Sequence, residues 1–484
     1  MPNMNPIYLP TPLSFASVPI QSIAENCHRL DASAYNMDVL MAKAKVIKYL
    51  NGYKLLWGED GLIKDAYYPG RYKRIYSNAN NGVPFFLPSQ LDEIYPKPSK
   101  YVSSKTASLL KKDLIKKGEL LLSRSGTIGK CTIASKTSIG RLFSDDVIRI
   151  TFKEDYDLGY VYAFFNTDAG LTLLQSNNYG AVIDHIEPEH LSHVLIPNAP
   201  IELRKRIHKL RMESFELRDK SNDLIDKAQE LLCVELQLPK LSSITPQCYM
   251  PQVAFNNYAV KASQLNGRLD ASYHIPLAAE VVRYVSANAK EVLTLGDYKL
   301  SKNIILAGVF KRTYVNKDQG VPFLGGRDIL TLSPRVEKYL SKTVHHTRIQ
   351  KELKVSENYI LISDRGTIGK VQIVPKHWND WAVSQNIIKV IPSNSNIAGY
   401  LYAYLSLDII SVLIKREIYG SVVDMIDDDN VASIPVPLLK NNSAQQQIND
   451  WVLEANDLRY QAYQKKSEAL QLMEDILDDH NKCE

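Results

Sequence analysis

Apolar and polar positions divide the chain into two kinds of stretch. In the first kind, short runs rich in Val, Ile, Leu and Tyr alternate with Gly, Pro and Asn, which is typical of strands separated by turns. This pattern predicts strands over residues 119–123, 146–150, 359–363 and 386–390. It also predicts helices over residues 161–174 and 401–415.

The second kind of stretch is a long helix that occurs twice. Residues 201–238 and 441–484 contain neither Gly nor Pro. In each, a seam of mainly apolar or small residues recurs at alternating steps of three and four, as in a coiled coil. The predicted seams are Ile207, Leu210, Ser214, Leu217, Ser221, Leu224, Ala228 and Leu231, and Ile448, Trp451, Ala455, Leu458, Ala462, Lys465, Ala469 and Leu472. A 38-residue helix is about 57 Å long. We therefore expect the two helices to pack as an antiparallel pair that holds two domains apart. The alternative is that each helix folds back onto its own domain.

The two halves of the chain repeat one another. Segments of the first half return in the same order 238 to 241 residues later, as in 29–33 with 268–272, 73–76 with 311–314, 82–85 with 320–323, 126–130 with 366–370, 159–163 with 399–403, and 179–184 with 419–424. A period this long indicates a duplicated domain. We therefore predict an α+β fold with two tandem mixed α/β domains, each followed by a long helix. The predicted boundaries are an N-terminal segment (1–28), domain 1 (29–200), spacer helix 1 (201–240), a linker (241–267), domain 2 (268–440) and spacer helix 2 (441–484).

Composition excludes several classes of protein. The 484 residues are 45% hydrophobic and 23% charged, with a net charge of +5, as in an ordinary globular protein. The sequence shows no membrane span and no secretory signal. Its five cysteines are scattered, without a Cys-x-x-Cys pair, which favours a reducing compartment and disfavours a zinc site. We expect a cytoplasmic protein.

Basic charge is concentrated in one part of each half. Residues 95–142 hold eleven Lys or Arg against two acids, and Tyr, Ser and Asn residues mix with further cations just upstream. Cations neutralise phosphates and amides can hydrogen-bond to base edges, so this pattern suits a nucleic-acid-binding face. A solvated basic surface is the alternative, and the run of charge alone does not decide between the two. The candidate DNA-binding residues are Arg71, Lys73, Arg74, Tyr76, Ser77, Asn78, Asn80, Arg124, Lys130, Lys311, Arg312, Tyr314, Asn316, Lys317, Arg327, Arg365 and Lys370.

No catalytic motif is evident. The Gly-Thr-Ile-Gly-Lys segments (126–130 and 366–370) have two residues between their glycines and lack the Ser or Thr that follows the Lys of a phosphate-binding Walker loop. We interpret them as strand-to-strand turns. His185 stands beside Asp184, but Met425 occupies the matching position of the second copy, so two equivalent acid–base sites are not implied. We predict no catalytic residue and no metal site.

The duplicated motifs resemble those of one family, the specificity (S) subunits of Type I restriction–modification enzymes. The resemblance covers nearly the whole chain. It rests on residues 121–130 and 361–370, on the Tyr-Gly-…-Asp segments at 179–184 and 419–424, and on the proline exits at 196–197 and 436–437 that lead into the long helices.

The resemblance implies a non-catalytic subunit. Each domain would read one half of a bipartite DNA target, and the helices would fix the gap between the halves. The chain itself would bind no cofactor. Its partners would be double-stranded DNA, two copies of a modification subunit and a motor–nuclease restriction subunit. The modification subunits would bind S-adenosylmethionine and methylate adenine. The assembled complex would then be an adenine DNA methyltransferase and a Type I restriction endonuclease. The polar loops of the two copies differ, so two different half-sites are expected.

Three alternatives stay open at this point. They are a stand-alone sequence-specific DNA-binding regulator, an RNA-binding adaptor built on the Gly-x-x-Gly loops, and an enzyme with a divergent catalytic centre. An apolar stripe left exposed on the long helices would favour the subunit over all three.

Overall fold

The computed structural model describes residues 17–25, 35–98, 100–126, 128–176, 185–248, 258–265, 267–420 and 422–478. Two of the repeated segments, 29–33 and 179–184, lie outside the described residues, as does most of the predicted N-terminal segment. No helix in the described part is both long and apolar enough to cross a membrane.

The first half of the chain forms a mixed domain, domain 1. Its helices are α1 (Ile20–Glu25), α2 (Met37–Ile47), α3 (Ser104–Leu109), α4 (Asp155–Phe165) and α5 (Asp168–Gln175). Its strands are β1 (Tyr53–Leu55), β2 (Ile63–Tyr67), β3 (Tyr76–Ser77), β4 (Gly82–Phe86), β5 (Lys100–Ser103), β6 (Leu120–Ser123), β7 (Cys131–Ile133), β8 (Leu142–Phe143), β9 (Val147–Phe152) and β10 (Leu195–Pro197).

The second half forms domain 2, which a short helix, α7 (Leu241–Cys248), precedes. Its helices are α8 (Pro276–Ala287), α9 (His346–Arg348), α10 (Ser395–Leu405), α11 (Ser411–Arg416) and α12 (Asp428–Ala432). Its strands are β11 (Ala289–Thr294), β12 (Ser301–Leu306), β13 (Tyr314–Val315), β14 (Gly320–Leu324), β15 (Tyr339–Ser341), β16 (Ile360–Ser363), β17 (Val371–Ile373), β18 (Ala382–Val383), β19 (Ile387–Pro392) and β20 (Pro435–Leu439).

The sheets of the two domains have the same strand order. Domain 1 contains an antiparallel sheet β2-β9-β6-β7, a sheet β3-β5-β4-β8 in which β4 and β8 are parallel, and the pair β1-β10. Domain 2 repeats them as β12-β19-β16-β17, β13-β15-β14-β18 and β11-β20. The predicted duplication and the α+β class are therefore confirmed, and the four predicted strands correspond to β6, β9, β16 and β19.

The helices predicted over 161–174 and 401–415 are each interrupted, so the prediction of continuous helices was wrong. The helix α4 ends at Phe165, and Thr167 begins α5 by accepting a hydrogen bond from the Gly170 N–H at 3.0 Å. A side chain at Gly170 would overlap the backbone oxygen of Phe164. The chain can therefore turn sharply between α4 and α5, and α10 and α11 are separated at the corresponding place.

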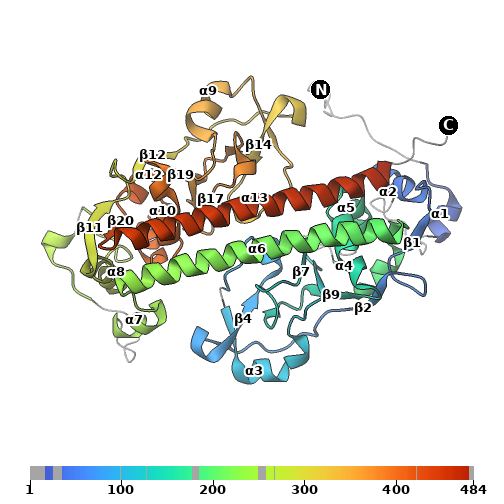
Figure 1. Ribbon diagram of the computed structural model, residues 1–484, viewed down its shortest axis with the longest axis horizontal. Coiled ribbons are helices and arrows are strands. Elements are labelled where there is room, and N and C mark those ends of the chain that lie inside the picture. Colours follow the sequence, from blue (N-terminus) through green and yellow to red (C-terminus); the bar gives the residue numbers. More distant parts are fainter. Residues whose placement is uncertain are drawn as a thin grey trace, which may run out of the picture.

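Two long helices, α6 (Ile201–Leu236) and α13 (Asn442–Asp478), cross the molecule side by side (Figure 1). At 1.5 Å per residue each is about 55 Å long. They run antiparallel, because Arg206 near the start of α6 pairs with Glu468 at 3.4 Å, whereas Asn441 at the start of α13 bonds Glu235 at 3.2 Å. The predicted antiparallel spacer is confirmed.

The seam between these helices differs in part from the predicted one. The positions Ile207, Ser214, Ser221 and Ala228, and Ile448, Ala455, Ala462 and Ala469, are buried as predicted. The second column was wrong by one residue over much of its length: Leu217 and Leu458 are only partly buried, while Arg218 and Arg459 are buried. Long charged side chains can occupy such positions because their aliphatic stems pack like apolar residues.

Each long helix contributes to the cores of both domains. The apolar core of domain 1 contains Ala469, Met473, Ile476 and Leu477 from the end of α13. The core of domain 2 contains Ile225, Ala228, Leu232 and Leu236 from the end of α6. Each domain is therefore completed by the helix that follows the other domain.

The domains also meet directly through two loops, crossing loop 1 (residues 93–98) and crossing loop 2 (residues 330–335). The Ile94 N–H donates to the Leu330 carbonyl at 2.8 Å. Lys97 of crossing loop 1 pairs with Asp408 of domain 2 at 3.2 Å, and Arg335 of crossing loop 2 pairs with Asp168 of domain 1. These symmetric contacts, together with the helix pair, fix the separation of the two domains.

Candidate nucleic-acid interface

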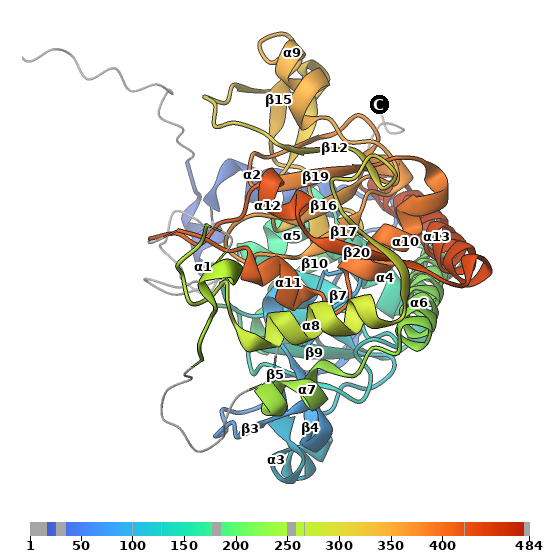
Figure 2. The ribbon, with the colours of Figure 1, turned by 90° about the vertical axis from the view of Figure 1, so that its left-hand side faces the viewer.

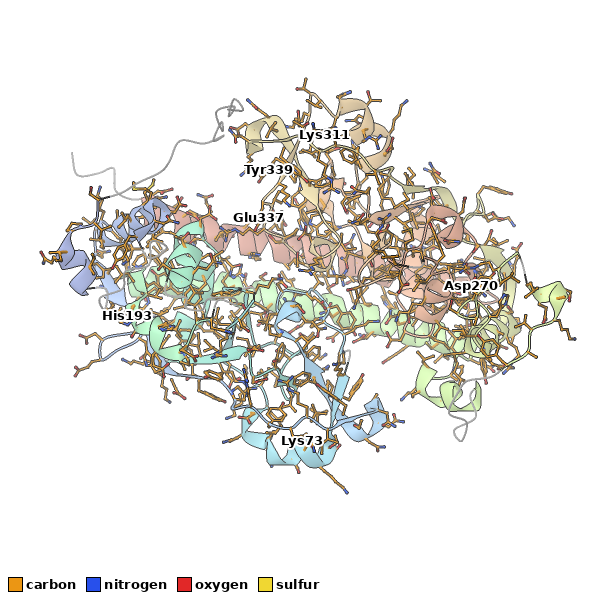
Figure 3. All side chains as sticks on the ribbon, turned by 180° about the vertical axis from the view of Figure 1, so that it is seen from behind. Lys73, His193, Asp270, Lys311, Glu337 and Tyr339 are labelled. Atoms are coloured by element: carbon orange, nitrogen blue, oxygen red, sulfur yellow. The ribbon has the colours of Figure 1, made fainter. Side chains whose placement is uncertain are left out.

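Most of the predicted DNA-binding residues lie on two small projecting sheets. Lobe 1 is the sheet β3-β5-β4-β8 with α3, and lobe 2 is the sheet β13-β15-β14-β18 with α9. The lobes project on opposite sides of the helix pair (Figures 1 and 2), and Lys73 and Lys311 lie near their outer edges (Figure 3). Both lysines are exposed.

The same ladder of cations and aromatic rings occurs in both lobes. In lobe 1, the Lys100 ammonium lies 5.0 Å from the Tyr76 ring, Tyr76 meets Phe85 edge-on at 6.3 Å, and the Arg74 guanidinium lies 5.2 Å from the Phe85 ring. Such contacts hold a cation over a ring and stiffen both side chains. The predicted residues Arg74 and Tyr76 therefore belong to one preorganised cluster.

Lobe 2 repeats the ladder with the residues 238 positions later. Lys338 lies 5.8 Å from the Tyr314 ring, Tyr314 lies 6.1 Å from Phe323, and Arg312 lies 5.5 Å from the Phe323 ring. The sequence-based prediction did not include Lys100 or Lys338 among its candidates. Lys100 follows Tyr76 by the same number of residues as Lys338 follows Tyr314, and this shared spacing in the two halves could have identified both lysines.

The two ladders differ at their inner ends. Arg74 pairs with Asp145, and although burial opposes it, this carboxylate raises the pKa of Arg74 above its usual value. Arg71 lies at 3.9 Å from the same carboxylate and is 93% exposed. In lobe 2 the matching position is Gln385, whose amide oxygen accepts from Arg312 at 2.6 Å. The Asp145 carboxylate offsets the charge of Arg74, whereas the neutral Gln385 does not offset the charge of Arg312, so lobe 2 has the higher net positive charge at this point.

The polar loops beside the ladders also differ. In lobe 1 the Asn78 side chain caps a short 3-10 helix (Ala79–Asn81) by accepting the Asn81 N–H at 3.1 Å, and the Ser77 hydroxyl donates to the Asn78 carbonyl. Asn80 is exposed. The equivalent 3-10 helix of lobe 2 (Lys317–Gln319) has no such side-chain cap from Asn316, and Asn316 and Lys317 are exposed. The exposed polar groups offered by the two lobes are therefore not the same.

The glycine turns occupy a different place from the lobes. They connect β6 with β7 and β16 with β17, as antiparallel hairpins, and Gly126, Gly129, Gly366 and Gly369 all have positive φ. A side chain at Gly129 would overlap Leu171 of α5. The interpretation of these segments as turns is confirmed.

The cations around these turns form ion pairs within the protein. Arg124 pairs with Glu187 and lies 4.4 Å from the Tyr68 ring, Lys130 pairs with Asp92 at 2.8 Å, and Arg365 bonds Asp364 at 3.0 Å. The remaining two candidates, Arg327 and Lys370, line cavities between the domains. Arg327 lines one cavity together with Lys130, and Lys370 lines the other. The structure therefore does not bring Arg124, Lys130, Arg327, Arg365 and Lys370 onto the lobes.

The described residues offer no cluster of His, Cys, Asp and Glu suited to a metal ion. His345, near the tip of lobe 2, is 9% exposed, and its Nε2 accepts the Thr313 N–H at 3.0 Å. It therefore supports the backbone just before Tyr314. His185 forms a backbone bridge with Ser125, and its neighbour Asp184 lies outside the described residues.

Residues 302–458 match the family described as the Type I restriction modification DNA specificity domain. This match covers most of domain 2. The match begins in β12, includes lobe 2 and the second glycine turn, and ends within α13. The resemblance inferred from the sequence is confirmed, and the strand order extends the fold of this specificity domain to domain 1. No curated protein matches the chain.

Solved structures similar to the chain come from the same kind of system. One is the S subunit of a Type I restriction–modification system from M. genitalium, at 13% identity over 88% of this chain and 95% of that chain, with a TM-score of 0.35. Another is the HsdS subunit from Thermoanaerobacter tengcongensis, at 12% identity over 88% and 99%, with a TM-score of 0.26. A third, from a study of assembly and conformational transition of the type I R-M system, has 13% identity over 84% and 94% and a TM-score of 0.27.

Proposed function

We propose that this chain is the DNA-specificity subunit of a Type I restriction–modification complex and reads a bipartite target. The observation that carries the proposal is the repeated cation–aromatic ladder, held on two lobes whose separation the helix pair fixes. Each ladder supplies cations for phosphates, and the differing polar loops supply groups for base edges. Lobe 1 would read one half-site and lobe 2 a different one.

The duplication also supports the proposed partners. Two equivalent halves related by an approximate two-fold axis present two equivalent surfaces, which suits two copies of a modification subunit. Those subunits would bind S-adenosylmethionine and methylate adenine, and a motor–nuclease subunit would join for restriction. In this role the chain itself binds no cofactor and carries no catalytic residue.

The exposed apolar stripe that would have supported the assembly is not present on the described parts of the long helices. Among the described residues of α6 and α13, the only large hydrophobic side chains that are exposed are Ile201 and Val234, at opposite ends of α6. The seam is used by the helix pair itself and by the domain cores. The partner surface therefore includes groups other than this seam.

The decisive experiment is a genome-wide map of methylated adenines in host cells with and without the gene. Loss of methylation at one split, asymmetric motif is expected. An unchanged map from an expressed protein contradicts the proposal; tight duplex binding by the chain alone would then favour a regulator, and a preference for single-stranded RNA would favour an adaptor.

Variants on the lobes test which residues contact DNA. Lys73→Ala and Lys311→Ala should each weaken binding to all sequences alike and reduce the salt-dependence slope of log K by about 0.9. Lys205→Ala is the matched control, because this exposed lysine lies on α6 and not on a lobe, where it pairs with Glu202 and lies 5.9 Å from the Tyr156 ring. Equal slopes for all three variants would show that the lobes do not contact phosphates.

Base reading is tested by the exposed loop amides. Asn80→Ala should cost about 1–3 kcal/mol and relax one position of one half-site, and Asn316→Ala should do so in the other half-site. The measurement is the methylation map of cells that carry each variant. Unchanged motifs in both would contradict a base-reading role for these two residues.

A further inference from the structure

A cavity of about 630 Å³, cavity 1, lies between the two domains and the helix pair. It is bounded by the glycine turn of domain 1, by residues 323–338 of domain 2, which include crossing loop 2, and by α6 and α13. A related cavity of about 590 Å³, cavity 2, lies at the second glycine turn and crossing loop 1. The two cavities correspond through the duplication, so each serves as a comparison for the other.

The wall of cavity 1 holds buried cations. Arg211 is 2% exposed and Arg218 is 9% exposed, and Lys466 lies beside them. In the described part of the chain no carboxylate lies within 4.0 Å of the charged groups of these three residues. Burial and the neighbouring Arg211 lower the pKa of Lys466 to about 7.

The hydrogen bonds of these cations are few and long. Arg211 donates to the Lys466 carbonyl at 3.5 Å and lies 4.3 Å from the Tyr162 ring, while its buried Nε has no partner. Lys466 donates to the Ser333 carbonyl, also at 3.5 Å. Buried charged donors are costly unless strong acceptors satisfy them.

The acids around cavity 1 do not supply these acceptors. Seven basic and five acidic side chains line it among the described residues. Asp92 pairs with Lys130, Asp168 pairs with Arg335, and Asp328 accepts the Gly325 N–H at 2.7 Å. The other two acids are Glu337, which is exposed, and Glu474, whose pKa burial raises. An excess of positive charge therefore faces the cavity.

Cavity 2 lacks this excess. With the 241-residue offset of the helix seams, Val452 corresponds to Arg211, and Ile225 corresponds to Lys466. Its lining holds three basic and three acidic residues among those described, and Lys97 pairs there with Asp408. Arg218 corresponds to another buried arginine, Arg459, so the duplication accounts for Arg218. It does not account for Arg211 and Lys466, and these two cations need a separate explanation.

We propose that cavity 1 binds an oligophosphate anion, such as inorganic pyrophosphate or the phosphates of a nucleotide. The guanidinium of Arg211 can offer parallel N–H donors to phosphate oxygens, with Arg218, Lys466 and Lys130 supplying further positive charge. The volume suits a ligand of that size. The bound anion bridges domain 1, crossing loop 2 and the helix pair, and so stabilises the separation of the lobes. The inference does not rest on the proposed DNA-binding role.

The test is isothermal titration of the full chain with inorganic pyrophosphate and, separately, with ATP. Saturable binding of one anion per chain and a higher melting temperature are expected. Arg211→Val and Lys466→Ile, which install the residues of the equivalent positions, should weaken binding by about 10- to 100-fold. Lys370→Ala, in the glycine turn at cavity 2, is the matched control and should leave the affinity unchanged.

Each outcome bears on the site. If Arg211→Val does not fold, Lys466→Ile and Lys130→Gln replace it, because the latter two side chains are less buried. Binding of either anion that both cavity 1 variants weaken supports the site, and the stronger ligand identifies an inorganic or a nucleotide source. No binding of either anion, unchanged affinity in the variants, or binding of duplex DNA alone overturns it.

Discussion

Replacement of Arg459 by Met is expected to make the protein more stable. Arg459 lies near the middle of α13, is 0% exposed, and has three guanidinium nitrogens without a hydrogen-bond partner. Its guanidinium lies 6.0 Å from the Tyr402 ring. Arg459 and Arg218 occupy matching positions of the antiparallel pair, and burial together with the charge of Arg459 lowers the pKa of Arg218. The arginine is therefore desolvated without compensation.

The size of the effect follows from these contacts. An unsatisfied buried donor costs about 1–3 kcal/mol, and a charged one costs more. Loss of the distant ring contact removes about 0.5–1 kcal/mol of stabilisation. Methionine fills most of the same space, so little cavity is created. The free energy of unfolding should rise by about 1–2 kcal/mol.

The assay is urea unfolding followed by far-UV circular dichroism, with Arg206→Met as the control. Arg206 is 61% exposed and pairs with Glu468, so its loss should change the free energy of unfolding by no more than about 1 kcal/mol. A loss of about 1 kcal/mol or more in Arg459→Met would refute the reasoning. It would show that the guanidinium has a favourable partner or sets the helix register.

Two further predictions concern helix packing and pH. Gly399→Ala should destabilise the protein by about 1–3 kcal/mol, because the new methyl group would overlap the backbone oxygen of Asn449 in α13. The control is Gly326→Ala, whose methyl group would meet open space and should be close to neutral. Equal melting temperatures of the two variants would contradict this packing argument. Burial lowers the pKa of His377 to about 4. Between pH 6.5 and 4 the unfolded chain therefore binds a proton at this histidine that the folded chain does not bind. The free energy of unfolding should fall by up to about 3 kcal/mol as the pH drops through that range. His377→Phe should remove this part of the acid sensitivity, and an unchanged pH profile of the melting temperature would count against it.

The sequence predicted the architecture because a duplication tests each assignment twice. The strands around the glycine turns were found, since their apolar runs recur in both halves. The break at Thr167 was missed because the apolar pattern continues across it, and the only local sign of a new helix is the cap that Thr167 forms with the Gly170 N–H. The shift of the seam to Arg218 and Arg459 was missed because burial there depends on the packing of neighbouring elements, which periodicity alone does not show.

The candidate site was predictable in composition more than in arrangement. The basic and aromatic residues around Arg74 and Tyr76 do lie together on lobe 1. Whether a given cation faces solvent depends on acids far away in the sequence: Glu187 pairs with Arg124 from 63 residues away. Such pairing cannot be read from local charge, so the glycine-turn cations were grouped with the lobes although they lie elsewhere.

The exchange of helix ends between the domains determines how this protein can be recombined. A chimera joined in the linker after α7 would give a foreign second domain the last turns of α6 from the wrong parent, including Leu232 and Leu236 of its core. The first domain would likewise receive Met473 and Leu477 from the incoming helix. The exchangeable unit of domain 2 is therefore one continuous segment that extends beyond the domain into both long helices: a functional swap must begin before Ile225 and must return to the original parent before Ala469.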